Sequence, residues 1–164
     1  MERPHVLVLS AMTLATLAMS VSAGFAQSAQ DLVGTWTLVS AVTEKDATKS
    51  DTFGPGAAGV LVFDASGLYT LTIIGGNLPA VLSNNRGNAT PEENKAIVSG
   101  SIAHFGTYAV SDKIITFNIH RATFPNWNAT EAKRPLVLTG DQLMYTVAAA
   151  SAGGTATVTW ERAK

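Results

Sequence analysis

From Asp31 to its end, the sequence alternates apolar and polar residues with a period of two, broken at short intervals by turn residues. This pattern constrains the fold more than any other feature, because it is typical of antiparallel β-sandwiches and β-barrels. The expected strands occupy residues 34–43, 59–63, 68–74, 104–110, 113–121, 134–138, 142–147 and 155–162. We therefore predict an all-β domain of about eight strands, most of which pair with their neighbours in sequence.

Three short links indicate which strands form hairpins. They are residues 64–67, 111–112 and 140–141, and they carry the Asp, Ser and Gly residues that tight turns favour. Counting outward from a turn at Ser111-Asp112 pairs Val110 with Lys113 and sets His104 near Ile119. His120 then lies next to His104 or diagonally across from it.

One segment departs from the strand pattern. Thr90, Pro91 and Glu93 have the spacing of a capping box with Pro in the first helical turn, which predicts a short helix over residues 91–98. The long polar loop at 75–89 precedes it. We expect loop and helix together to cover one mouth of the domain, since long loops in compact β domains are often functional lids.

The first 26 residues have a different composition. A positive start at Arg3 precedes an uncharged apolar run over residues 6–21, and small residues stand at Gly24 and Ala26. This is the pattern of a secretory signal peptide, with cleavage after Ala26 or, as the alternative, after Ala23. The run of about 16 apolar residues is short for a membrane anchor. We expect residues 1–26 to be removed, and residues 27–164 to form a periplasmic or secreted domain.

Composition excludes several function classes. Charged residues make up 14% of the chain and the formal net charge is −1, which argues against a nucleic-acid partner and against stable membrane insertion after cleavage. No cysteine is present, so disulfides, thiolate metal sites and thiol nucleophiles are excluded. The sequence also lacks the glycine-rich phosphate-binding motifs. We expect no cofactor and no metal.

The two ends of the domain distinguish a barrel from a sandwich. In an up-and-down barrel the first and last strands are neighbours. Trp36 lies in the first strand, where it shares a face with Leu38 and Ser40, and Arg162 ends the last strand. We predict that the Arg162 guanidinium stacks on the Trp36 indole and closes one end of a barrel. The alternative is a plain core Trp36 and a solvated Arg162.

Gly34-Thr35-Trp36 together with Arg162 resembles the lipocalin or calycin signature, and the wider sequence resembles the bacterial and fungal lipocalin-like domain family. The matching segments are residues 32–40, 53–55, 59–63 with Gly67, 90–94, 103–108, 124–127 and 160–162. The resemblance implies a closed antiparallel lipocalin-like barrel with a cavity for a small apolar or amphipathic molecule. It carries over no catalytic residue. The chain departs from the family at His104, where an aromatic residue is more usual, and it has no second histidine beside His120.

The candidate catalytic residues are His104, His120, Arg134 and Tyr108. Two histidines on one face can act as an acid–base pair or bind a metal, whereas separate histidines belong to a polar wall or the surface. An inward Arg134 can bind a carboxylate or an enolate-like oxygen, whereas an outward one belongs to a solvated strand face. Tyr108, like Tyr69 and Tyr145, either offers a phenol to a cavity or packs in the core.

The candidate ligand-binding residues are Phe124, Asn126 and Trp127, with His104 and Tyr108. Pro125 fixes the backbone between the two aromatic residues, and Asn126 can both donate and accept hydrogen bonds. This segment either lines a cavity mouth or plugs one end of the barrel.

Three functions follow from these residues. The first is an exported binding protein for a small molecule. The second is an isomerase, cyclase or dehydratase in which His104 or His120 moves a proton and Arg134 or a tyrosine stabilises an oxyanion. The third is a structural or inhibitory module with a filled barrel. A cavity of about 300 Å³ or more, the low end for ligand pockets, separates the first two from the third.

Overall fold

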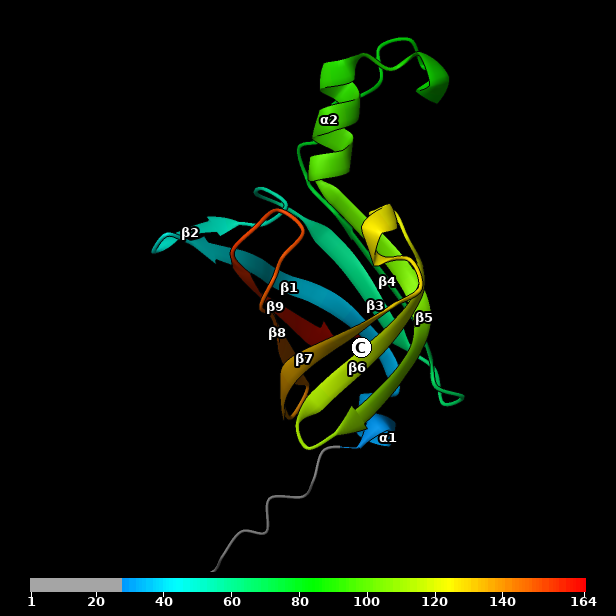
Figure 1. Cartoon of the computed structure of the whole chain (residues 1–164), viewed down its shortest axis with the longest axis vertical. Coiled ribbons are helices and arrows are strands. Elements are labelled where there is room, and N and C mark those ends of the chain that lie inside the picture. The colour runs from blue at the N-terminus through cyan, green and yellow to red at the C-terminus, as the bar shows by residue number, and fades with distance from the viewer. Residues whose placement is uncertain (1–27) are drawn as a thin grey trace, which may run out of the picture.

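The computed structural model describes residues 28–164, so the predicted signal peptide at 1–26 lies outside the described residues. One antiparallel sheet has the order β2-β1-β3-β4-β5-β6-β7-β8-β9, and an additional pairing of β1 with β9 closes it into a barrel. The strands are β1 (Gly34–Lys45), β2 (Thr48–Asp51), β3 (Ala58–Phe63), β4 (Leu68–Ile74), β5 (Ser101–Ser111), β6 (Ile114–Ala122), β7 (Thr130–Thr139), β8 (Gln142–Val147) and β9 (Thr155–Arg162). The prediction of a closed all-β barrel is confirmed, and β2 is an additional strand outside the closed ring (Figure 1).

Two turns differ from the predicted hairpins: one joins a strand that was not predicted, and the other shifts the pairing of β5 with β6. Asp46 and Ala47 both have positive φ, as a two-residue type I′ turn requires, and they join β1 to the unpredicted β2. Asp112 and Lys113 also have positive φ, at 51° and 62°. The hairpin between β5 and β6 therefore turns one residue later than expected.

This later turn changes the position of both histidines. Ser111 pairs with Ile114, and His104 pairs with Ala122 instead of lying near Ile119. A bulge between Phe105 and Gly106 shifts the register further. A Cβ at Gly106 would clash with the backbone oxygen of Asn118, so no larger residue fits this close approach of the strands.

A second bulge changes the inward face of β1. It lies between Leu38 and Ser40 in the pairing with β9. Trp36 is fully buried before it, and Ala41 and Thr43 are buried after it, so the prediction that Ser40 shares a face with Trp36 was wrong. A bulge adds one residue to its strand and thereby exchanges the two faces.

The end of the barrel near α1 (Ala29–Leu32) is closed. Leu32 is fully buried, and its carbonyl oxygen accepts a hydrogen bond from Trp36 Nε1 at 2.8 Å. The Arg162 guanidinium lies 4.2 Å from the centroid of the Trp36 ring, which is the contact that the sequence predicts. Arg162 also donates to the backbone oxygens of Val33 and Asp31.

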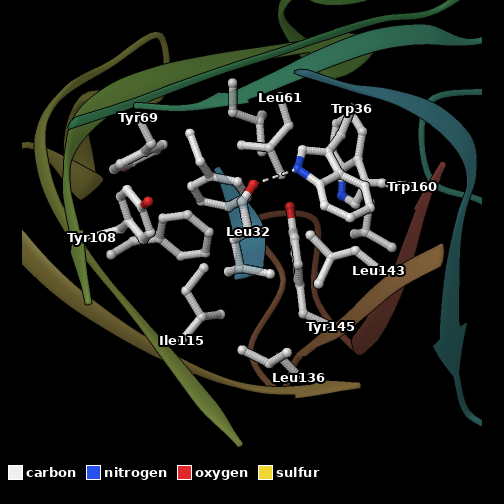
Figure 2. Packing of buried hydrophobic residues seen from close by; sticks show 14 of the residues in the cluster. Leu32, Trp36, Leu61, Tyr69, Tyr108, Ile115, Leu136, Leu143, Tyr145 and Trp160 are labelled. Atoms are coloured by element: carbon white, nitrogen blue, oxygen red, sulfur yellow. Dashed lines mark hydrogen bonds between the residues drawn. The ribbon is translucent and has the colours of Figure 1, made fainter. Parts of the chain in front are cut away.

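Large side chains fill the half of the barrel next to this closed end. Figure 2 shows them converging from strands all around the wall, with Leu32 at the centre of the group. The largest fully buried side chains are Trp36, Trp160, Tyr145, Phe63, Phe117, Leu32, Leu61, Leu71, Ile115, Ile119, Leu136 and Leu143. Burying an aliphatic or aromatic side chain of this size contributes about 1.5–3 kcal/mol, which suits a chain that has no disulfide.

The predicted helix is present as α2 (Pro91–Ser99), and a short 3₁₀ helix, η1 (Arg86–Asn88), precedes it. The Thr90 hydroxyl accepts from the Glu93 backbone N–H, and the Glu93 carboxylate accepts from the backbone N–H groups of Thr90 and Leu82. This ties the loop to the helix. However, Figure 1 shows α2 projecting beyond the rim, so the expectation that residues 75–98 cover the mouth was wrong.

Candidate functional site

Two adjoining spaces lie at the open end of the barrel. The outer one is a basin of about 340 Å³, and the inner one is a deep cavity of about 50 Å³. Thr52, Phe53, Ile102 and Ser151 line both spaces, so the basin leads into the deep cavity. The deep cavity alone is smaller than the ~300 Å³ of an ordinary ligand pocket, and the two spaces together exceed it.

The basin is built from the ends of several elements. Phe53 follows β2, Ile97 and Val98 belong to the end of α2, and Phe124 comes just before η2 (Pro125–Trp127). Ile102 contributes from β5, beyond the helix. The rim is therefore mainly apolar, although α2 itself does not cover it.

Arg134 is the most unusual residue of the deep cavity. It lies on β7, points into the barrel and is only 4% exposed. Its Cζ lies 5.0 Å from the Phe117 ring centroid, 5.2 Å from that of Tyr145 and 5.7 Å from that of Trp127. Its Nε has no hydrogen-bond partner, and no carboxylate within residues 28–164 forms an ion pair with it.

Next to this cation, His104 and Tyr69 form a buried pair. The Tyr69 hydroxyl lies 2.8 Å from His104 Nδ1. Burial, and then the positive charge of Arg134, lower the pKa of His104 from 6.5 to about 3. Burial raises the pKa of Tyr69 far above its ordinary value of 10. Both side chains are therefore neutral near pH 7, whichever of them donates the shared proton.

Tyr145 completes the polar part of the cavity. It is 1% exposed, and its ring packs against Phe117 at a centroid distance of 5.8 Å. Burial raises the pKa of its hydroxyl, and the positive charge of Arg134 opposes that increase. The interior thus combines one cation with neutral hydroxyl and imidazole groups.

The structure brings some of the sequence-predicted residues together. His104, Arg134 and Trp127 meet in the deep cavity, and the Trp127 ring lies 5.8 Å from the His104 ring. Phe124 packs on Trp127 at 5.6 Å and lines the basin. The segment over 124–127 is therefore part of a cavity wall and not a plug.

Other predicted residues lie elsewhere. His120 is exposed on the outside of β6, where its ring faces Phe105, so the two histidines do not share a face. The Tyr108 hydroxyl donates to the backbone oxygens of Ala29 and Asp64 at the closed end, away from the cavity. Asn126 is exposed, and the amide that organises this loop is Asn128, whose Oδ1 accepts from the Ala122 N–H at 2.8 Å.

Sequence reasoning did not assign Phe53 and Tyr145, which line the deep cavity, or Phe117, which packs against Arg134, to the site. Neither Phe53 nor Phe117 was a site candidate, although both are aromatic, and Tyr145 was left open between cavity and core. The alternation of β6 would have placed Phe117 on the same face as Ile115 and Ile119, both of which are buried. Phe53 entered the sequence analysis only within the 53–55 segment that resembles the family, and no pattern assigned its side chain to the site.

Within residues 28–164, no group of three or more His, Cys, Asp or Glu residues is placed to hold a metal ion. No helix of this region is long and apolar enough to cross a membrane.

Strand order, the pairing of the first and last strands and the internal cavity define a closed antiparallel barrel of the lipocalin-like class. The chain belongs to the lipocalin-like domain family, which matches residues 33–163. The crystal structure of a mutant of the fluorescent protein UnaG is similar to 82% of this chain and 98% of its own, with 12% identity and a TM-score of 0.38. No functionally curated protein matches the sequence.

Proposed function

We propose that the protein binds a small, mainly apolar molecule at the open end of its barrel. The observation that carries this proposal is the apolar basin leading to a deep cavity with a few converging polar groups, Arg134, His104 and Tyr145. Ligand sites commonly combine an apolar lining with a small number of polar groups that fix orientation. The ligand body lies in the basin, and one narrow end enters the deep cavity.

A proton-transfer enzyme is the second candidate, because His104, which lines the deep cavity, shares a hydrogen bond with the buried Tyr69 hydroxyl. The pKa of His104, about 3, argues against it. A general base works best when its pKa lies near the operating pH, and this imidazole has little affinity for a proton at pH 7. We therefore rank binding above catalysis.

A filled barrel that acts through its surface is the third candidate. The small volume of the deep cavity supports it. Against it stands Arg134, because a core that serves only for stability has no need of a buried cation without a counter-ion.

The binding proposal is tested by NMR titration of the tryptophan indole N–H signals with small apolar alcohols. Trp127 lines the deep cavity, whereas Trp36 is sealed at the closed end and hydrogen-bonded to Leu32. We expect a saturable shift of the Trp127 signal and little change at Trp36. Equal shifts at both, or none at Trp127, would contradict the proposal. Native mass spectrometry of protein from its own cells then identifies the natural ligand.

We further propose that the protein is exported from a bacterial or fungal cell and that residues 1–26 are removed on the way. The support is the sequence pattern of a short positive start, an apolar run and small residues before Gln27. The intact mass of the protein recovered from the medium or cell envelope tests this. A chain that begins at Gln27 agrees with the proposal, and a full-length chain retained in the cytoplasm contradicts it.

A further inference from the structure

We infer that the end of the ligand that enters the deep cavity is a single carboxylate, which pairs with Arg134. This inference rests on the proposed function, because it names the chemical class of the molecule held at the same site.

Arg134 has no counter-ion among the described residues. Charged side chains are almost never fully buried unless they are paired or bind a ligand. Arg134 is 4% exposed, its Nε is unsatisfied, and residues 28–164 provide no carboxylate partner. Glu131, on the same strand, is exposed and pairs with Lys133 at 3.1 Å. An anion from outside the chain supplies the missing interaction.

The surrounding aromatic rings do not replace that anion. Phe117, Tyr145 and Trp127 attract the cation through their faces. The ring faces accept no hydrogen bond from the guanidinium, and the Tyr145 hydroxyl, which is hydrogen-bonded to Arg134, is neutral and brings no balancing charge. A carboxylate does accept such hydrogen bonds, often two in parallel, which is why arginine recurs at carboxylate sites.

The charge of the cavity limits the ligand to one negative charge. Among the described residues that line the deep cavity, Arg134 is the cation, and His104 is neutral near pH 7. A dianion such as a phosphate monoester would keep one charge buried without compensation. The neutral Tyr145 and His104 groups, which line the deep cavity, then serve as further hydrogen-bond partners around a monoanion.

The volumes of the deep cavity and the basin limit the shape of the ligand. A space of about 50 Å³ accepts a headgroup but not a bulky body, which has to lie in the basin of about 340 Å³ next to Phe53 and Phe124. The inferred ligand is therefore a compact monocarboxylic acid with an apolar or aromatic body.

Calorimetric titration with matched acids and alcohols tests the inference. The probes are benzoate with benzyl alcohol, and hexanoate with 1-hexanol, at pH 7. We expect the unmodified protein to bind each acid at least tenfold more tightly than its alcohol. In Arg134→Met the affinity for each acid should fall at least tenfold, while the affinity for each alcohol changes by less than threefold. Arg134→Lys should retain part of the preference for the acid over its alcohol.

The control is Arg86→Met, which removes one exposed positive charge from η1 and leaves the barrel intact. It should leave every affinity unchanged, which excludes a general effect of net charge.

The outcomes separate the two proposals. If acids and alcohols bind equally well, the inference fails while the proposed binding function stands. If none of the four probes shifts the Trp127 indole signal, the proposed function itself fails. Should Arg134→Met not fold, the preference of the unmodified protein and the response of Arg134→Lys still decide the result. Weaker acid than alcohol binding would overturn the inference.

Discussion

Arg162 lies over Trp36, with its Cζ 4.2 Å from the centroid of the ring, and so links the last strand of the barrel to the first. The same guanidinium donates to two backbone oxygens, of Val33 at 2.9 Å and of Asp31 at 2.8 Å. The closed end is thus held by one cation that satisfies carbonyls and covers an indole.

The first prediction concerns this contact. Arg162→Met should lower the free energy of unfolding by about 1–3 kcal/mol, because it removes two charged hydrogen bonds together with the stacking. In a double-mutant cycle with Trp36→Leu, the coupling should be about 0.5–2 kcal/mol. Chemical denaturation gives the free energy of unfolding of the unmodified protein, the two single variants and the double variant. Lys164→Met, an exposed neighbour, is the control, and strictly additive effects of the two substitutions would show that the stacking contributes nothing.

The second prediction is a pH dependence that His104 causes. Its pKa is about 3 in the folded protein and 6.5 ordinarily, so between these values the unfolded chain binds a proton that the folded chain does not. The free energy of unfolding should therefore fall as the pH drops from about 6.5 towards 3, by up to about 1.4 kcal/mol per pH unit from this group.

Carboxylate groups also make the free energy of unfolding depend on pH. Comparing two histidine variants separates the contribution of His104 from theirs. His104→Gln, whose amide can still meet the Tyr69 hydroxyl, should lose that part of the slope. His120→Gln should keep it, since His120 is exposed on the outer face. Identical slopes for His104→Gln and the unmodified protein would disprove the assignment.

The third prediction concerns the stability of the protein without ligand. Arg134→Met should leave the free energy of unfolding unchanged or raise it by up to about 2 kcal/mol, because burying a cation without a counter-ion costs more than three ring contacts and one hydrogen bond to the neutral Tyr145 hydroxyl return. Thermal and urea unfolding of the ligand-free variant and the unmodified protein measure this difference in the free energy of unfolding. A loss of more than about 2 kcal/mol would mean that Arg134 is a structural residue of the core.

The fourth prediction tests the bulge that follows His104. Gly106→Ala should destabilise the protein by at least about 2 kcal/mol, since the new methyl group meets the Asn118 backbone and cannot push it aside. Gly87→Ala, whose added Cβ would meet only the Asn85 side chain at 3.3 Å, is the matched control and should change stability by less than about 0.5 kcal/mol. Equal effects at both positions would contradict the close strand contact.

Much of the fold could be predicted because its signals are local. Alternation located the eight strands of the barrel, and the capping box at Thr90 and Glu93 located α2. Trp36 and Arg162 gave the one long-range contact needed to distinguish a closed sheet from an open one. The exception was β2, whose Asp46-Ala47 turn has no glycine to mark it.

The site was harder to predict because it depends on register. A turn at Asp112-Lys113 instead of Ser111-Asp112, with the bulge at Gly106, decides which histidine points inward. A shift by one residue exchanges the two faces of a strand, and the sequence does not fix such shifts. The same reason left the direction of Arg134 open.

A crystal structure with 4-bromobenzoate tests directly whether a carboxylate reaches Arg134, the contact on which the inferred ligand class depends. The bromine marks one end of the ligand through its anomalous signal. We predict the carboxylate within about 2.7–3.1 Å of the Arg134 nitrogens, and the bromine in the basin near Phe53 and Phe124. A bromine in the deep cavity with the carboxylate in solvent, or a ligand only on the outer surface at saturating concentration, would contradict the account.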